Sequence, residues 1–265
     1  MNNKIEAVIF DWAGTTVDYG CFAPVQAFIE VFKEYKIEPT MEETREPMGM
    51  LKWDHIKAMM SMPRINAEWK KIYGRDFTDA DIDEMHDKFS TKLLSILHNF
   101  GTPKPYVVET VNKLKENGIK IGSTTGYTDN MMEIVIKAAK EQGYEPDAWF
   151  SPTSTNNVGR PYPFMAFKNM EALKVSSVKN VVKVGDTKSD ILEGKNAGVW
   201  IVGVIEGSSE MALTEEEYNA LSDAEKKEAK KKVKEKFLNA GADYVISDMR
   251  ELPSLIEKIE NENLK

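Results

Sequence analysis

Hydrophobic residues follow two patterns along most of this chain. Short apolar runs rich in β-branched residues, such as residues 5–10 and 181–184, predict buried parallel strands. Between such runs, apolar positions recur every three or four residues, as in residues 107–117, which predicts amphipathic helices. Because the two patterns alternate, we expect an α/β fold: a Rossmann-like parallel sheet with right-handed crossovers and helices on both faces.

The apolar runs and the turn residues after them place the individual elements of the core. Strands are expected at residues 5–10, 119–125, 149–150, 181–184, 199–204 and 244–246. Helices are expected at residues 107–117, 130–142, 165–173 and 189–196.

Residues 24–98 depart from this alternation, because their apolar positions keep helical spacing and no convincing strand interrupts them. Examples are Val25, Phe28, Ile29 and Phe32, and later Ile82, Met85, Phe89 and Leu93. We therefore expect an inserted α-helical domain, called the cap below. The predicted boundaries are residues 21–99 for the cap domain, and residues 1–20 and 100–265 for the core domain.

A strongly charged segment occupies residues 214–239, where glutamates are followed by many lysines and apolar positions are sparse. It is typical of a solvated helical hairpin packed on the core. The alternative is an arm that docks a second subunit.

Composition narrows the classes of function. The chain is 42% hydrophobic and 29% charged, with a net charge of -8, which argues against a nucleic-acid surface. It holds no apolar run long enough to span a membrane, and its N-terminus leads straight into a strand, with no room for a signal peptide. Cys21 is the single cysteine, so no internal disulfide is expected, which fits a reducing cytoplasm.

The candidate chemistry begins at Asp11, which ends the first predicted strand just before Gly14. This position is at the carboxyl edge of the predicted sheet, where open α/β proteins build their sites. Three further segments follow at strand ends or in the loops after them: Thr125-Gly126-Tyr127, Gly159-Arg160-Pro161 and Gly185-Asp186-Thr187-Lys188-Ser189-Asp190. Taken singly, Thr125 could be a helix cap, Arg160 a surface charge and Asp190 a carboxylate that complements a helix dipole.

In this order, the four segments resemble the motifs of the haloacid dehalogenase-like (HAD) family of phosphoryl-transfer enzymes. The resemblance implies a HAD-like core with a helical cap, and an aspartyl-phosphate formed on Asp11. It also implies Mg²⁺ held by Asp11, Asp186 and the backbone carbonyl of Ala13, with Asp190 fixing a metal-bound water or a basic partner. Thr125, Gly126 and Arg160 are then expected to bind the phosphoryl group.

One position departs from the family pattern. Ala13 stands where the first motif, Asp-x-Asp-Gly-Thr, carries the aspartate that protonates an alkoxide leaving group. The cap segment Pro47-Met48-Gly49-Met50-Leu51-Lys52 resembles the branch of the family that cleaves carbon–phosphorus bonds, in which a cap lysine forms a Schiff base. An iminium next to the breaking bond accepts its electrons, so the leaving group is a neutral enamine that needs no such acid.

This resemblance implies the substrate phosphonoacetaldehyde, from 2-aminoethylphosphonate, with Lys52 as the imine-forming residue and a homodimer as the assembly. Among so many lysines, Lys52 could otherwise be a surface residue. Met48 and Tyr127 are expected near the substrate. His55, one helical turn after Lys52, could shuttle protons or simply pack within the cap.

Three other functions compete with this reading. A sugar-phosphate mutase or small-molecule phosphatase with a helical cap normally keeps an acid where Ala13 stands. A metal-free haloacid dehalogenase, whose aspartate attacks carbon, conflicts with Asp186 and Asp190. A catalytically inactive binding module conflicts with the intact set Asp11, Asp186 and Lys52.

Overall fold

The structure is a computed structural model and describes residues 4–262. Its core is one parallel sheet of strand order β3-β2-β1-β4-β5-β6. After β1, the chain adds β2 and β3 on one side of it and then β4, β5 and β6 on the other side. Strands β1 and β4 therefore lie side by side at the centre of the sheet. The strands are β1 (Ala7–Phe10), β2 (Lys120–Thr124), β3 (Ala148–Phe150), β4 (Val181–Gly185), β5 (Trp200–Val204) and β6 (Tyr244–Ile246).

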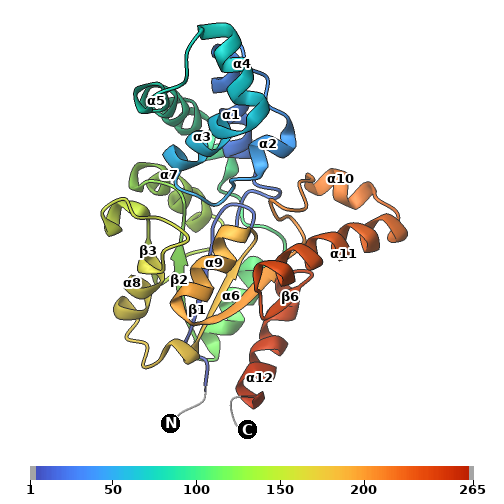
Figure 1. The fold of residues 1–265 in the computed structure, drawn as a ribbon. Helices are drawn as coiled ribbons and strands as arrows, with labels where there is room; N and C mark the ends of the chain where they lie inside the picture. Colours follow the sequence, from blue (N-terminus) through green and yellow to red (C-terminus); the bar gives the residue numbers. More distant parts are fainter. Residues whose placement is uncertain (1–3, 263–265) are drawn as a thin grey trace.

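Helices cover both faces of this sheet (Figure 1). One face carries α8 (Phe164–Ala172), α9 (Lys188–Ala197) and α11 (Asp223–Ala240), and the other carries α6 (Val107–Glu116), which packs in turn against α12 (Leu252–Glu262). The α/β fold with a parallel sheet is therefore confirmed, and every strand expected from the sequence is present. The first strand begins at Ala7, two residues later than expected.

Residues 22–100 form a separate group of helices beyond the carboxyl ends of the strands, at the top of Figure 1. As expected, no strand is assigned within this segment, all of which lies in the described part of the chain. Its helices are α1 (Phe22–Glu34), α2 (Met41–Arg45), α3 (Lys52–Ser61), α4 (Pro63–Tyr73), α5 (Asp79–Ile96) and the short helix η1 (Leu97–Phe100).

The remaining helices complete the core. Helix α7 (Asp129–Lys140) follows β2 and contacts η1. Short helices η2 (Pro152–Thr155), η3 (Val178–Asn180) and η4 (Met249–Glu251) fill connections. The charged segment forms α10 (Glu215–Ala220) and α11, each started by a capping box, and projects to one side (Figure 1). Among residues 4–262, no helix combines the length and apolar character that crossing a bilayer requires.

Aromatic packing holds the cap together. Phe28 of α1 is fully buried and stacks on Phe89 of α5, with ring centroids 4.2 Å apart. The opposite side of Phe28 stacks on His55 of α3 at 3.9 Å. One aromatic ring thus joins three cap helices, and the cap carries a hydrophobic centre of its own.

We expect Phe89→Ala to destabilise the protein by about 3–4 kcal/mol, because a buried ring is lost and the cavity cannot fully collapse. Denaturant unfolding followed by circular dichroism measures this change. Phe167→Ala is the matched control, since Phe167 lies on α8 with 41% of its surface exposed, and its cost should stay within about 0.5 kcal/mol. Equal costs for the two variants would contradict the packing described here.

Candidate active site

Asp11 lies directly after β1, where its backbone N–H donates to the carbonyl of Val184 on β4 at 2.9 Å. The chain then turns sharply through Gly14, whose φ is +86°. A Cβ at this position would lie 2.2 Å from Oδ2 of Asp186, so a side chain is excluded for steric as well as conformational reasons. Glycine therefore lets the carboxylates that follow β1 and β4 approach one another.

The Asp186 carboxylate follows β4 and is fully buried. Its Oδ1 accepts a hydrogen bond from the Thr15 hydroxyl at 2.8 Å, and its Oδ2 accepts one from the backbone N–H of Ser209 at 2.7 Å. Both oxygens are thus oriented before any ligand arrives.

Three buried carboxylates, Asp11, Asp186 and Asp190, each offer an oxygen within 4.8 Å of the others. Burial, followed by the charges of Asp11 and Asp190, raises the pKa of Asp186 well above its ordinary value. Burial and then Asp190 also raise the pKa of Asp11, although Arg160 opposes this effect. Excess negative charge on hard oxygen donors is what a small divalent cation would neutralise, so these residues fit such an ion.

Arg160 lies at the centre of a buried network of charges. Its Nη2 contacts Oδ1 of Asp11 at 2.7 Å and Oδ1 of Asp190 at 3.1 Å, while its Nε donates to Oε2 of Glu193 at 3.0 Å. Lys183 of β4 is fully buried and contacts Asp190 at 3.0 Å and Glu193 at 3.5 Å. Arg160 is therefore held on three sides by carboxylates and cannot be a surface charge.

Asp190 and Thr187 form the capping box of α9. The Thr187 hydroxyl accepts from the backbone N–H of Asp190 at 3.2 Å, and Oδ2 of Asp190 accepts from the Thr187 hydroxyl at 2.6 Å. Arg160 and then Lys183 lower the pKa of Asp190, against its burial. Asp190 is thus part of the capping box of α9 and also contacts the two basic residues beside Asp11.

The loop after β2, which carries Thr125, Gly126 and Tyr127, forms another side of the site. Thr125 is buried, and its hydroxyl accepts from the backbone N–H of Tyr127 at 3.0 Å. Gly126 approaches the cap closely, because a Cβ there would lie 3.0 Å from the carbonyl oxygen of Met50. The hydroxyl of Tyr127 is buried without a hydrogen-bond partner among the described residues.

The cap meets the core through residues 47–51. The carbonyl of Met48 accepts from the Ser189 hydroxyl at 3.2 Å. Gly49 has φ +86°, and a Cβ there would lie 2.4 Å from Oγ1 of Thr187. A glycine is therefore needed for the cap to close on the start of α9.

Lys52 is the first residue of α3, and the contact between the cap and the core places its side chain between them. Only 4% of its surface is exposed. Its Nζ lies 5.2 Å from the ring centre of Tyr127 and 5.8 Å from that of Phe28. Burial lowers the pKa of the Lys52 amine, and the charge of Arg160 adds to this effect, whereas Cys21 and Asp11 oppose it. Its place at a helix N-terminus also disfavours a positive charge. The surroundings of Lys52 therefore favour the neutral form of its amine.

His55 lies on the same turn of α3 and is fully buried. Its Nε2 lies 2.9 Å from the carbonyl of Thr44, which can only accept, so Nε2 carries the proton. Burial, followed by the charge of Lys52, lowers the pKa of His55 well below its ordinary value. Nδ1 is then a bare acceptor, with no partner among the described residues. This geometry is compatible with both roles expected for His55.

A small cavity of about 20 Å³ joins these groups. The nucleophile candidate, the cap lysine and the phosphoryl-binding candidates all line it, whereas Asp186, Asp190 and His55 do not. Its lining is Asp11, Ala13, Cys21, Met48, Gly49, Lys52, Thr125, Gly126, Tyr127, Arg160 and Thr187. Because residue 13 is an alanine, its methyl group lines the cavity where the family pattern has an acid.

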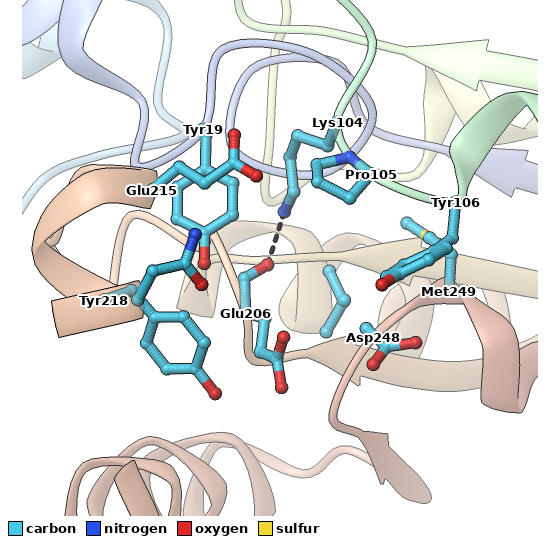
Figure 2. A pocket seen from close by; sticks show the side chains of 11 residues that line it. Tyr19, Lys104, Pro105, Tyr106, Glu206, Glu215, Tyr218, Asp248 and Met249 are labelled. Atoms are coloured by element: carbon cyan, nitrogen blue, oxygen red, sulfur yellow. Dashed lines mark hydrogen bonds between the residues drawn. The ribbon is translucent and has the colours of Figure 1, made fainter. Parts of the chain in front are cut away.

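A larger cavity of about 190 Å³ lies beside Lys104 (Figure 2). Tyr19, Glu206 and Tyr218 surround it, and no residue predicted for the chemistry lines it. Lys104 also lines it and donates to the carbonyls of Gly14 and Glu206, the latter at 2.6 Å. Burial lowers the pKa of Lys104 to about 8.

Several buried residues of the site carry no motif and were missed from the sequence. They are Glu193, Lys183, Lys104, Arg45, Cys21 and Asp18. Asp18 caps the start of α1, where its carboxylate accepts from the N–H groups of Phe22 and Ala23 at 2.9 and 3.0 Å. The available signal was weak: Lys183 interrupts an apolar strand, and Glu193 follows Asp190 by one helical turn.

The model of the family described as haloacid dehalogenase-like hydrolase matches residues 5–198 of this chain. The chain belongs to the haloacid dehalogenase-like hydrolases. It is 53% identical over 259 residues to a phosphonoacetaldehyde hydrolase of Lysinibacillus sphaericus, covering 98% of this chain and 96% of the relative.

Two other relatives extend this comparison. A bifunctional phosphonoacetaldehyde hydrolase/aminoethylphosphonate transaminase of Clostridioides difficile is 52% identical, over 99% of this chain and 41% of the relative. The crystal structure of a phosphonoacetaldehyde hydrolase-like protein from Oleispira antarctica is 40% identical, with a TM-score of 0.94, and covers 98% of this chain and 94% of that one. These haloacid dehalogenase-like relatives match the cap as well as the core.

We expect Glu193→Gln to destabilise the protein by about 3 kcal/mol, because Arg160 and Lys183 lose a buried counter-charge. Denaturant unfolding tests this, and the KM for a phosphorus-containing substrate should rise as Arg160 loses its orientation. Glu171→Gln, on the exposed surface of α8, is the control and should change neither quantity. An unchanged KM in a folded Glu193→Gln protein would show that Glu193 does not orient Arg160.

Proposed function

We propose that this protein hydrolyses the carbon–phosphorus bond of phosphonoacetaldehyde to acetaldehyde and phosphate, as a step in 2-aminoethylphosphonate degradation. The observation that carries the proposal is the buried amine of Lys52, which shares a small cavity with Asp11, while alanine at position 13 provides no acid. The names of the full-length relatives support it, and the fused transaminase of the C. difficile relative is the class of enzyme that would supply the aldehyde.

In the proposed reaction, Nζ of neutral Lys52 adds to the aldehyde carbon, and a proton moves from nitrogen to oxygen to give a carbinolamine. Protonation of its hydroxyl by a proton from solvent lets water leave, and an iminium remains. A carboxylate oxygen of Asp11 then attacks phosphorus, and the electron pair of the carbon–phosphorus bond moves into the iminium to give a neutral enamine. Protonation at carbon and hydrolysis release acetaldehyde and restore Lys52. Water hydrolyses the aspartyl-phosphate and restores Asp11.

The phosphoryl group is proposed to lie among Thr125, Gly126 and Arg160, which line the same cavity as Asp11. Arg160 is suited to this role because its planar group offers several donors in fixed directions. Met48 and Tyr127 would flank the aldehyde end beside Lys52. His55, with its bare Nδ1, is proposed as the acceptor of a proton during imine formation.

Mg²⁺ is the cation proposed for the carboxylate cluster, held by Asp11, Asp186 and the carbonyl of Ala13, with Asp190 in support. When bound, it would offset the repulsion between the Asp11 carboxylate and the phosphonate. Within the protein itself, Thr15 and Ser209 keep Asp186 oriented for this purpose.

The domain boundaries also belong to this proposal: a cap of residues 21–99, and a core of residues 1–20 and 100–265. The cavity between the cap and the core is small, at about 20 Å³, and in this proposal the substrate enters when the cap moves away from the core and is held when the cap closes again. A homodimer is the proposed assembly.

Borohydride trapping tests the two covalent steps separately. In Asp11→Asn, the imine should still form on Lys52, so borohydride with phosphonoacetaldehyde should add mass to the peptide containing Lys52. Phosphate release should fall by roughly a thousandfold or more, because the covalent route is lost. Lys52→Arg should lose both trapping and turnover. A folded Asp11→Asn protein without any adduct would contradict the proposed order of steps.

Trapping in Asp11→Asn should also depend on pH through the Lys52 amine. Only the neutral amine adds to the aldehyde, and burial lowers the pKa of Lys52. The trapping rate should therefore rise with pH and reach its plateau below about 10.4, the ordinary pKa of lysine. A midpoint at or above that value would show that Lys52 is not desolvated when it reacts.

Metal titration tests the carboxylate cluster. Asp186→Ala should weaken Mg²⁺ binding measured by calorimetry about 10- to 100-fold, and excess Mg²⁺ should recover part of the activity. Asp147→Ala, near the start of β3, is the control and should bind Mg²⁺ like the unchanged protein. Equal affinities for all three proteins would contradict the proposed metal site.

A further inference from the structure

A short loop after β5, residues 206–209, connects Asp186 with the cap. The backbone N–H of Ser209 donates to Oδ2 of Asp186 at 2.7 Å, so the position of the loop helps to set the position of that carboxylate. This loop is called the Asp186 loop below. It carries none of the four motifs that characterise the site.

Three carbonyl groups of the Asp186 loop accept hydrogen bonds from the cap or its connections, whereas that of Ser208 accepts one from the backbone N–H of Ala212. Gly20, which leads into the cap, donates its N–H to Gly207 at 2.8 Å. Arg45, at the end of cap helix α2, donates from Nη1 to Ser209 at 3.2 Å. Lys104, on the return from the cap, donates to Glu206 at 2.6 Å (Figure 2).

Arg45 is the donor whose position depends most directly on the cap. Its side chain crosses to the core, where Nη1 also donates to the carbonyl of Gly20 at 2.7 Å. Only 8% of its surface is exposed, and its guanidinium lies 4.7 Å from the ring centre of Phe22. Nε and Nη2 are buried without hydrogen-bond partners among the described residues.

Two buried, unpaired donors oppose the placement of Arg45. The hydrogen bond from Arg45 to Ser209 offsets only part of this cost. The packing of α2 alone therefore does not explain why an arginine occupies position 45. A role in the closed state does account for it, since the contact exists only while α2 lies against the core.

We propose that Arg45 and Lys104 are positioning residues that couple closure of the cap to the orientation of Asp186 through the Asp186 loop. When the cap closes, Arg45 binds the carbonyl of Ser209, and the N–H of the same residue is held towards Oδ2 of Asp186. When the cap opens, Arg45 withdraws and the carboxylate loses part of its support. Lys104 holds the other end of the loop and, through the carbonyl of Gly14, the turn that follows Asp11.

This inference rests on the metal site of the proposed function, but its test needs no substrate. Calorimetric titration with Mg²⁺ reads the orientation of Asp186 whether or not phosphonoacetaldehyde is turned over. Arg45→Met should weaken Mg²⁺ binding about tenfold, as is typical when a partner outside the direct ligands is lost. Arg45→Lys should recover part of the affinity, because lysine can still donate to one carbonyl.

Matched variants separate this effect from general destabilisation. Arg64 is another cap arginine, but its ion pairs with Glu43 and Glu68 are exposed, so Arg64→Met should leave Mg²⁺ affinity unchanged. Lys104→Met should weaken binding, whereas Lys120→Met should not, because Lys120 donates to the carbonyl of Leu173, outside the site. Affinities within twofold of the unchanged protein for folded Arg45→Met and Lys104→Met would overturn the inference.

Hydrogen exchange provides the reciprocal measurement without any variant. If closure favours Mg²⁺ binding, Mg²⁺ must favour closure to the same extent. Saturating Mg²⁺ should therefore slow exchange in residues 41–50 of the unchanged protein, and this protection should be smaller in Arg45→Lys, which keeps part of the contact, and unchanged in Arg64→Met. Exchange in residues 41–50 that does not respond to bound Mg²⁺ would overturn the coupling, even if Arg45→Met failed to fold.

Discussion

The site depends on the ion pairs that hold Arg160 among carboxylates from two parts of the chain. Asp11 follows β1, while Asp190 and Glu193 come from α9, and Lys183 contacts the latter two from within β4. Buried charges of this kind are costly when one partner is missing. The network therefore fixes the distances between the ends of the central strands, and with them the geometry in which phosphorus can be attacked.

The cap contributes the other half of the site by excluding water. Lys52 lies at the start of a helix that is pressed onto the core through Gly49. Removing the amine from water favours its neutral form, which is the form that can add to an aldehyde. The same closure brings Arg45 against the loop that supports Asp186. Activation of the amine and orientation of the carboxylate are thus consequences of one movement.

The fold and the main site residues were predictable because they rest on local patterns. The apolar runs indicated each strand, and Asp11 and Asp186 directly follow two of these runs. Lys52 was indicated only by the resemblance of its segment to one branch of the family. Glu193 and Arg45 were not predictable, because their roles come from contacts between segments far apart in sequence. Glu193 contacts Arg160, 33 positions away, and Arg45 contacts Ser209, 164 positions away. A charged residue on a helix is usually solvated, and only the packed structure shows that these two are buried.

The size of the cavity has a consequence for the choice of phosphoryl acceptor. About 20 Å³ is room for a single water molecule and little more. In the proposed reaction the phosphoryl group on Asp11 would itself take up this space, so the acceptor would have to enter beside it while the cap stands partly open. The extent of that opening, and not a group that recognises water, would then decide between hydrolysis and transfer to a larger alcohol.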